Sequence, residues 1–71
     1  MTQEIKTLMT KYQNLFDTYL ETLDKLDYVH PSTVGHKRVM NTLSEISTEL
    51  RKIDTQITIK IHNYAQVRTN Q

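Results

Sequence analysis

Histidine is the residue type in this chain best suited to bind a metal or transfer a proton, and the sequence has three. His30 and His36 flank a break that holds the only proline and the only glycine. His62 lies far along the next segment, on the order of tens of ångströms away if that segment is helical. The first two fit no established zinc spacing, and cysteine is absent. The sequence therefore predicts no metal site and no cofactor.

Carboxylates are the second candidate for chemistry, because paired carboxyl groups can act as general acid and base. Four of them share one side of the first segment: Asp17, Glu21, Asp24 and Asp27. Acid–base catalysis needs a concave, partly dry site, and the surface of a single helix is convex. With no cysteine and one glycine, the chain also lacks a thiol nucleophile and a Gly-rich phosphate loop. We therefore expect no enzymatic activity and a solvated acidic face.

Basic side chains could contact nucleic acid, but their pattern does not favour it. They are scattered along the second segment, at Lys37, Arg38, Arg51, Lys52, Lys60 and Arg68. Acidic residues lie between them, no aromatic stacking platform accompanies them, and the net charge is only +1. Nucleic acid would fit only a dimer that joined two such faces. No apolar run exceeds two residues, so the sequence predicts no membrane span.

Two long apolar patterns supply the elements that position these residues. In the first segment the steps of three and four are typical of a helix over about 3–29, with an apolar arc of about 140°. Its apolar positions are Ile5, Leu8, Met9, Tyr12, Leu15, Phe16, Tyr19, Leu20, Leu23, Leu26 and Val29. Pro31 restricts His30 to non-helical dihedrals, which predicts a turn over 30–33. Ser32 or Thr33 can then cap the next helix.

The second segment predicts a longer helix over about 34–67 with a narrower seam and a frayed tail at 68–71. Its seam positions are Val39, Leu43, Ile46, Leu50, Ile53, Ile57, Ile61 and Tyr64. Residues 57–61 alternate as a strand would, yet the seven-residue repeat runs through them, so we expect a helix there as well.

A short break between two such helices predicts an all-α antiparallel hairpin, coiled-coil-like, as a single unit over residues 1–71. Residues 1–29 carry three basic and five acidic side chains, whereas residues 33–71 carry six basic and three acidic ones. The two predicted helices therefore have net charges of opposite sign. Folding about residue 31 would place these side chains near one another: Ile5 and Ile57, Tyr12 and Leu50, Phe16 and Ile46, Tyr19 and Leu43, Leu23 and Val39.

The hairpin as predicted is incomplete in two ways. The second helix is longer, so Ile61, Tyr64 and Val67 should overhang without a neighbour in the same chain. The first helix has the wider apolar arc, so one flank should stay uncovered. Eleven threonines also weaken intrinsic helix stability, which makes packing against another chain more important. The residues expected to bind a partner are Met9, Tyr12, Phe16, Tyr19, Leu20, Ile61, Tyr64 and Val67.

Residues 30–65, with an X-Pro turn and an isoleucine-rich helix ending in Ile57-Thr-Ile-Lys-Ile-His62-Asn63-Tyr64-Ala65, resemble the small E-component of type III secretion needle chaperones. The turn here reads His30-Pro31, where some members have an acidic residue before the proline. The resemblance implies a cytoplasmic co-chaperone that docks its seam on a repeat-type chaperone of the needle subunit. The alternative is a homodimeric four-helix bundle, a structural or regulatory subunit that a phage could encode and that could contact nucleic acid or inhibit a host factor.

Overall fold

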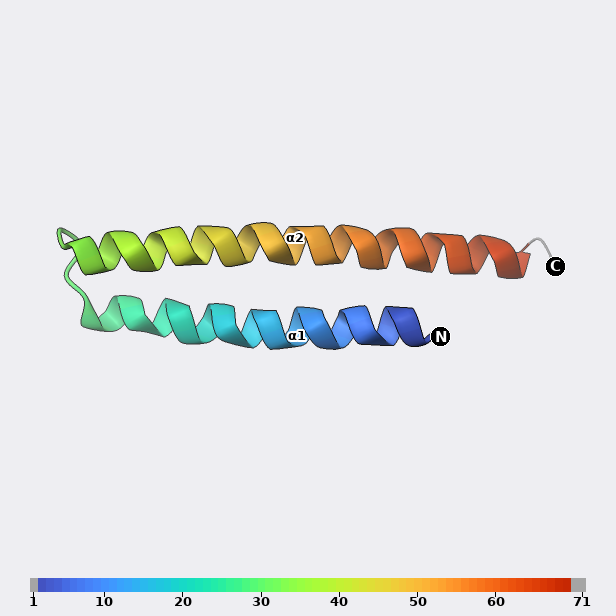
Figure 1. Cartoon of the computed structure of the whole chain (residues 1–71), viewed down its shortest axis with the longest axis horizontal. Helices are drawn as coiled ribbons and strands as arrows, with labels where there is room; N and C mark the ends of the chain where they lie inside the picture. The colour runs from blue at the N-terminus through green and yellow to red at the C-terminus, as the bar shows by residue number, and fades with distance from the viewer. Residues whose placement is uncertain (1, 70–71) are drawn as a thin grey trace.

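The structure, a computed structural model, describes residues 2–69 and consists of two long antiparallel helices side by side (Figure 1). Helix α1 spans Gln3–Asp24, a short 3₁₀ helix η1 spans Lys25–Tyr28, and helix α2 spans Val34–Thr69. The described part of the chain contains no strand. The predicted all-α helical hairpin is therefore confirmed, including helical geometry through the β-branched stretch at 57–61.

Both ends of α1 have a local physical cause. At the start, the Thr2 hydroxyl accepts a hydrogen bond from the Ile5 amide at 3.3 Å, and Glu4 lies in the first turn, where the helix dipole favours an anion. At the end, α-helical geometry stops at Asp24, five residues before the predicted Val29. The chain then tightens into η1, and Val29 after it is extended. Hydrogen bonds in a 3₁₀ helix span three residues instead of four, which is a common way to satisfy carbonyls at the end of an α-helix.

The turn is held by His30 and Thr33. The Thr33 amide and hydroxyl both donate to the His30 carbonyl, at 3.0 and 2.8 Å. The Thr33 hydroxyl in turn accepts from the His36 amide at 3.2 Å, so Thr33 rather than Ser32 caps α2. Ser32 instead hydrogen-bonds the His30 ring at Nδ1, which makes His30 a structural residue of the turn.

Replacing Thr33 by Ala is expected to destabilise the fold by about 1 kcal/mol, because the amides of the first turn of α2 lose their acceptor. Urea unfolding followed by circular dichroism measures this free energy. The matched control is Thr48→Ala, which removes an exposed mid-helix hydroxyl that donates to the Ser44 carbonyl. That control should leave stability unchanged or raise it slightly, because alanine is the better helix former. Equal losses in both variants would contradict the capping role.

The core is a single line of side chains along the contact between α1 and α2. Its buried members are Ile5, Thr22, Leu43, Ile46, Leu50 and Ile53. The Thr22 hydroxyl donates to the Thr18 carbonyl at 2.8 Å, so this buried polar group is satisfied. The remaining seam residues of α1 are only half-buried, because each helix has just one neighbour.

The register of the two helices differs from the predicted one. Glu4 pairs with Lys60 at 2.9 Å, and Met9 lies across a hollow from Ile57, the residue expected beside Ile5. These contacts displace the predicted pairing by about half a turn to one turn toward the C-terminal end of α2, although Tyr19 and Leu43, one of the five predicted pairs, still line a common hollow. The cause is the connection: η1 and the extended Val29 lengthen it, so the chain folds back later than residue 31.

Candidate functional site

One long side of the hairpin carries a continuous row of apolar side chains that the chain leaves partly exposed. On α1 they follow at intervals of seven, four and three residues, and on α2 two more lie at the edge of the same side. We define the open face by Met9, Phe16, Leu20, Leu23, Met40 and Ile61, whose exposed fractions are 39, 37, 44, 40, 46 and 43%. Adjacent large apolar side chains on one side of a small protein are a candidate interaction surface.

Two hollows between the helices connect Met9 and Leu23 of α1 with residues of α2. Leu23 lines a hollow together with Met40 and Ser47 of α2. Met9 lines another with Asp54 and Ile57. Met40, Ser47, Asp54 and Ile61 recur every seven residues, so they form one stripe along α2. The open face therefore runs along most of the hairpin, with one carboxylate, Asp54, on its α2 edge.

An aromatic ridge forms the base of the open face on α1. The rings of Tyr12 and Phe16 lie 6.3 Å apart, centroid to centroid, and are inclined by 8°. Phe16 and Tyr19 continue the series at 6.4 Å and 13°. These spacings lie within the range of favourable aromatic pairs. The ridge therefore presents large apolar area with few free torsions, which lowers the entropy lost on binding.

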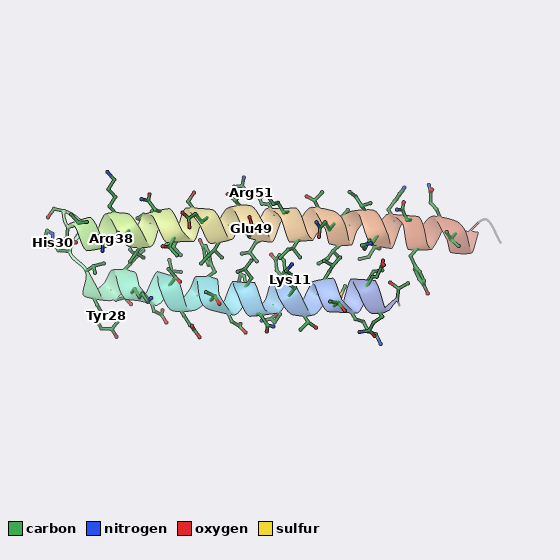
Figure 2. The ribbon with its side chains drawn as sticks, viewed as in Figure 1. Lys11, Tyr28, His30, Arg38, Glu49 and Arg51 are labelled. Atoms are coloured by element: carbon green, nitrogen blue, oxygen red, sulfur yellow. The ribbon has the colours of Figure 1, made fainter. Side chains whose placement is uncertain are left out.

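The outer surfaces of the two helices are polar by contrast. A hollow on α1 is lined entirely by polar side chains: Gln3, Lys6, Thr7, Thr10, Lys11 and Asn14. On α2 the corresponding hollow is lined by Thr48, Arg51, Lys52, Thr55 and Gln56. Figure 2 shows Arg51 on the side of α2 that faces away from α1. The hairpin is thus amphipathic as a whole, beyond the amphipathicity of each helix.

The predicted partner-binding residues separate into three groups. Met9, Phe16, Leu20 and Ile61 lie on the open face, and Tyr12 and Tyr19 are half-buried at its base. Val67 is 58% exposed, but it follows Ile61 by six residues and so lies about 120° away around α2. Tyr64 was expected to overhang freely; it is half-buried, so this expectation is wrong.

The predicted overhang of α2 is present. Helix α2 has 36 residues against 22 in α1 and 4 in η1, and its last turns extend past the N-terminus of α1 (Figure 1). In the shifted register the start of α1 lies beside residues near Lys60. Ile5 is buried there, with an exposed fraction of 1%. The frayed tail was predicted to begin at residue 68, but α2 continues through Thr69. Residues 70–71 lie outside the described part of the chain.

Sequence reasoning missed two residues of the site and misplaced one position of the seam. Leu23 was assigned to the contact with α2, and Met40 was not among the residues expected to bind a partner, yet both are exposed on the open face. The signal for Leu23 was its spacing of seven from Phe16 and of fourteen from Met9. On α2, Lys60 rather than Ile61 occupies the half-buried seam position.

Glu4 and Lys60 form an ion pair between the two helices. The Lys60 ammonium donates to the Glu4 carboxylate, and this hydrogen bond, together with the positive charge, lowers the pKa of Glu4 below its ordinary value. A lowered pKa in the fold means that Glu4 contributes stability above the pKa it has when unfolded. That contribution is lost as the pH falls through the folded-state value.

Replacing Glu4 by Gln is therefore expected to flatten the pH dependence of stability between about pH 6 and pH 3. The unmodified protein should lose more unfolding free energy over this range than the variant. Urea unfolding at several pH values measures both curves. Glu21→Gln, at an exposed glutamate elsewhere on α1, serves as control and should leave the slope as it is. A slope that Glu4→Gln leaves unchanged would contradict the ion pair and the register that it fixes.

The residues with potential chemistry stay apart in the fold. His30 lies in the turn, where Figure 2 also shows Tyr28 pointing away from α2, and His62 is exposed far along α2. Among the residues that the structure describes, no three side chains of the metal-binding types come together. Within the same part of the chain, no helix is long and apolar enough to span a membrane.

The comparisons with known proteins give no match among family models, curated proteins or solved structures. The open face is therefore interpreted from its own geometry. Its six apolar side chains on one side of two rigid helices are suited to contact a second helical surface, by ridges of side chains entering grooves. They form no deep, enclosed pocket of the kind that binds a small molecule.

Proposed function

We propose that the protein is a non-enzymatic helical interaction module that binds another helical surface with its open face. The observation that carries this proposal is the partial exposure of six large apolar side chains along one side of the hairpin. Completing the burial of such a side chain contributes on the order of 1 kcal/mol, because it is already about half covered. Several together are enough to hold a helical partner.

The overall dimensions support the same proposal. The Cα radius of gyration is 16.8 Å, against about 11 Å for a compact chain of this length. The molecule measures 58 × 15 × 12 Å, so it has the width of one helix along its shortest axis. Five apolar side chains form the buried core, which is little for a free-standing domain. A surface from another chain would supply the missing layer.

A more specific role comes from the resemblance of residues 30–65 to the needle-chaperone E-component. In that form of the proposal the protein is a cytoplasmic adaptor or co-chaperone, and its open face docks on a helical repeat protein of type III secretion. The second candidate is a homodimeric four-helix bundle, in which the open faces of two copies would cover each other. Both candidates use the same surface, so one experiment addresses them together.

Photo-crosslinking from single positions tests the open face in cells that produce the protein. A benzoylphenylalanine at Leu20 lies on the open face, and one at Ile59, 54% exposed on the other side of α2, is the matched control. We expect discrete adducts from position 20, whether with a second copy or with another protein, and none from position 59. Equal labelling from both positions, or no adduct from position 20, would contradict the proposed function.

A further inference from the structure

We propose that Lys60 is a pairing-specificity residue: it allows the seam of α2 to pack on α1 and prevents that seam from assembling with the α2 seams of other copies. This role belongs to the contact between α1 and α2, and it is independent of the open face. Three features of the molecule lead to it: the pattern of the α2 seam, the place of Lys60 in that pattern, and the position of the carboxylate that Lys60 contacts.

The α2 seam has the pattern of a helix that can associate with copies of itself. We define the α2 seam by eight positions, all buried or half-buried: Val39, Leu43, Ile46, Leu50, Ile53, Ile57, Lys60 and Tyr64. In the seven-residue repeat, Leu43 and Leu50 occupy a positions, and Ile46 and Ile53 occupy d positions. Leucine at a with isoleucine at d favours bundles of three or four identical helices. Such a bundle would compete with α1 for the same side chains.

Lys60 is the one charged residue of the α2 seam, and its own helix offers it no carboxylate. It follows Ile53 by seven residues, so it occupies the next d position. The stretch 56–64, four residues to either side, contains no acidic residue. In a parallel α2 bundle, the Lys60 ammonium groups of all copies would lie in one layer. Removing unpaired like charges from water is costly, so this layer opposes the bundle.

An antiparallel pair of α2 helices would not relieve the problem. Each Lys60 would then lie among seam residues of the other copy, and none of the eight seam residues is acidic. The ammonium group would again lose water without gaining a carboxylate.

Helix α1 supplies the carboxylate that the α2 seam lacks. The Lys60 Nζ donates a hydrogen bond to a Glu4 carboxylate oxygen at 2.9 Å. The Lys60 side chain is 40% exposed, so its stem can lie along the seam while its ammonium group keeps contact with water. Packing on α1 is therefore the arrangement in which this lysine has both a carboxylate and solvent.

The same lysine also distinguishes between registers on α1. Lys11 and Thr18 follow Glu4 at intervals of seven residues, so the three share one stripe of the helix. A displacement of α2 by one repeat would bring Lys60 beside Lys11, which has the same charge. A displacement by two would bring it beside the uncharged Thr18. Lys60 thus specifies both the helix on which α2 packs and the level at which it packs.

The test adds Lys60→Ile to the Leu20→Asp protein, in which association through the open face is already removed. Isoleucine completes the α2 seam, so we expect self-association to appear, with a dissociation constant at least about tenfold below that of Leu20→Asp alone. Sedimentation equilibrium over a concentration series measures it. Because an α2 bundle needs only α2, the association is detected even if the hairpin opens in this variant.

Two matched variants in the same background isolate the charge at this seam position. Lys60→Glu also breaks the contact with Glu4, but it keeps a charge in the seam, so it should not associate. Lys52→Ile removes a lysine whose partner Glu49 lies on the same helix, at 3.2 Å, and it adds isoleucine outside the seam. Its association should stay within about threefold of that of Leu20→Asp alone.

Association of the Lys60→Ile variant alone among the three would support the role of Lys60. A Lys60→Ile protein that stays monomeric, folded or unfolded, would overturn it, because the completed seam would then show no tendency to self-associate. Equal association of Lys60→Glu would assign the effect to the lost ion pair, and equal association of Lys52→Ile would assign it to added hydrophobicity. Either result would overturn the role, and neither depends on whether the open face binds a partner.

Discussion

Replacing Leu20 by Asp is expected to abolish association through the open face. Leu20 is the most exposed α1 residue of this face, at 44%, and its neighbours Phe16 and Leu23 lie one turn away on either side. The variant would bury a carboxylate without a partner, twice in a symmetric dimer. We expect the dissociation constant to rise at least about a hundredfold. Sedimentation equilibrium over a concentration series measures the change.

Ile59→Asp is the matched control for this effect. It introduces the same carboxylate at an exposed large apolar residue that lies outside the open face. Association should stay within about threefold of the unmodified protein. Circular dichroism should show that Ile59→Asp keeps the unfolding midpoint of the unmodified protein, whereas Leu20→Asp lowers it, because the hairpin loses the layer that association supplies. Equal weakening by both substitutions would show that association depends on general hydrophobicity and not on the open face.

Replacing Ile53 by Ala is expected to unfold the hairpin at room temperature. Ile53 is 5% exposed and belongs to the five apolar residues that form the buried core. Truncating a buried isoleucine costs about 2–5 kcal/mol, which is comparable to the whole stability of a domain this small. Thermal and urea unfolding followed by circular dichroism measure the loss.

The control for the core substitution is Ile59→Ala, which makes the same change at a side chain that is 54% exposed. The free energy of unfolding of the Ile59→Ala variant should change by less than about 0.5 kcal/mol, and the higher helix propensity of alanine should add a small gain. If Ile53→Ala were as mild as Ile59→Ala, the single line of core contacts described here would be wrong.

The two helices and their turn could be predicted from the sequence because local rules decide them. Steps of three and four between apolar residues define the helical seams, and Pro31 with a capping threonine defines the break. The β-branched stretch at 57–61 is helical because the packing of its seam outweighs the local strand propensity.

The register could not be predicted to better than about one turn, because it depends on how the connection is built. The start of α2 relative to α1 depends on three features of the connection. These are the end of α1 five residues earlier than predicted, the tight turn of η1 and the extended Val29. That shift explains why Tyr64 is half-buried and why Lys60 reaches Glu4. The division of the apolar arc between covered and exposed sides, with Leu23 and Met40 on the open face, also depends on the register.

The central claim is that the isolated hairpin lacks a layer and that another chain, a second copy in the simplest case, supplies it through the open face. The most direct test is the unfolding midpoint of the unmodified chain, measured by circular dichroism as a function of protein concentration. If folding is coupled to dimerisation, the midpoint should rise by about 3–5 °C for each tenfold increase in concentration. A sharp midpoint that is independent of concentration, from a species with a mass of 8.4 kDa, would contradict the account.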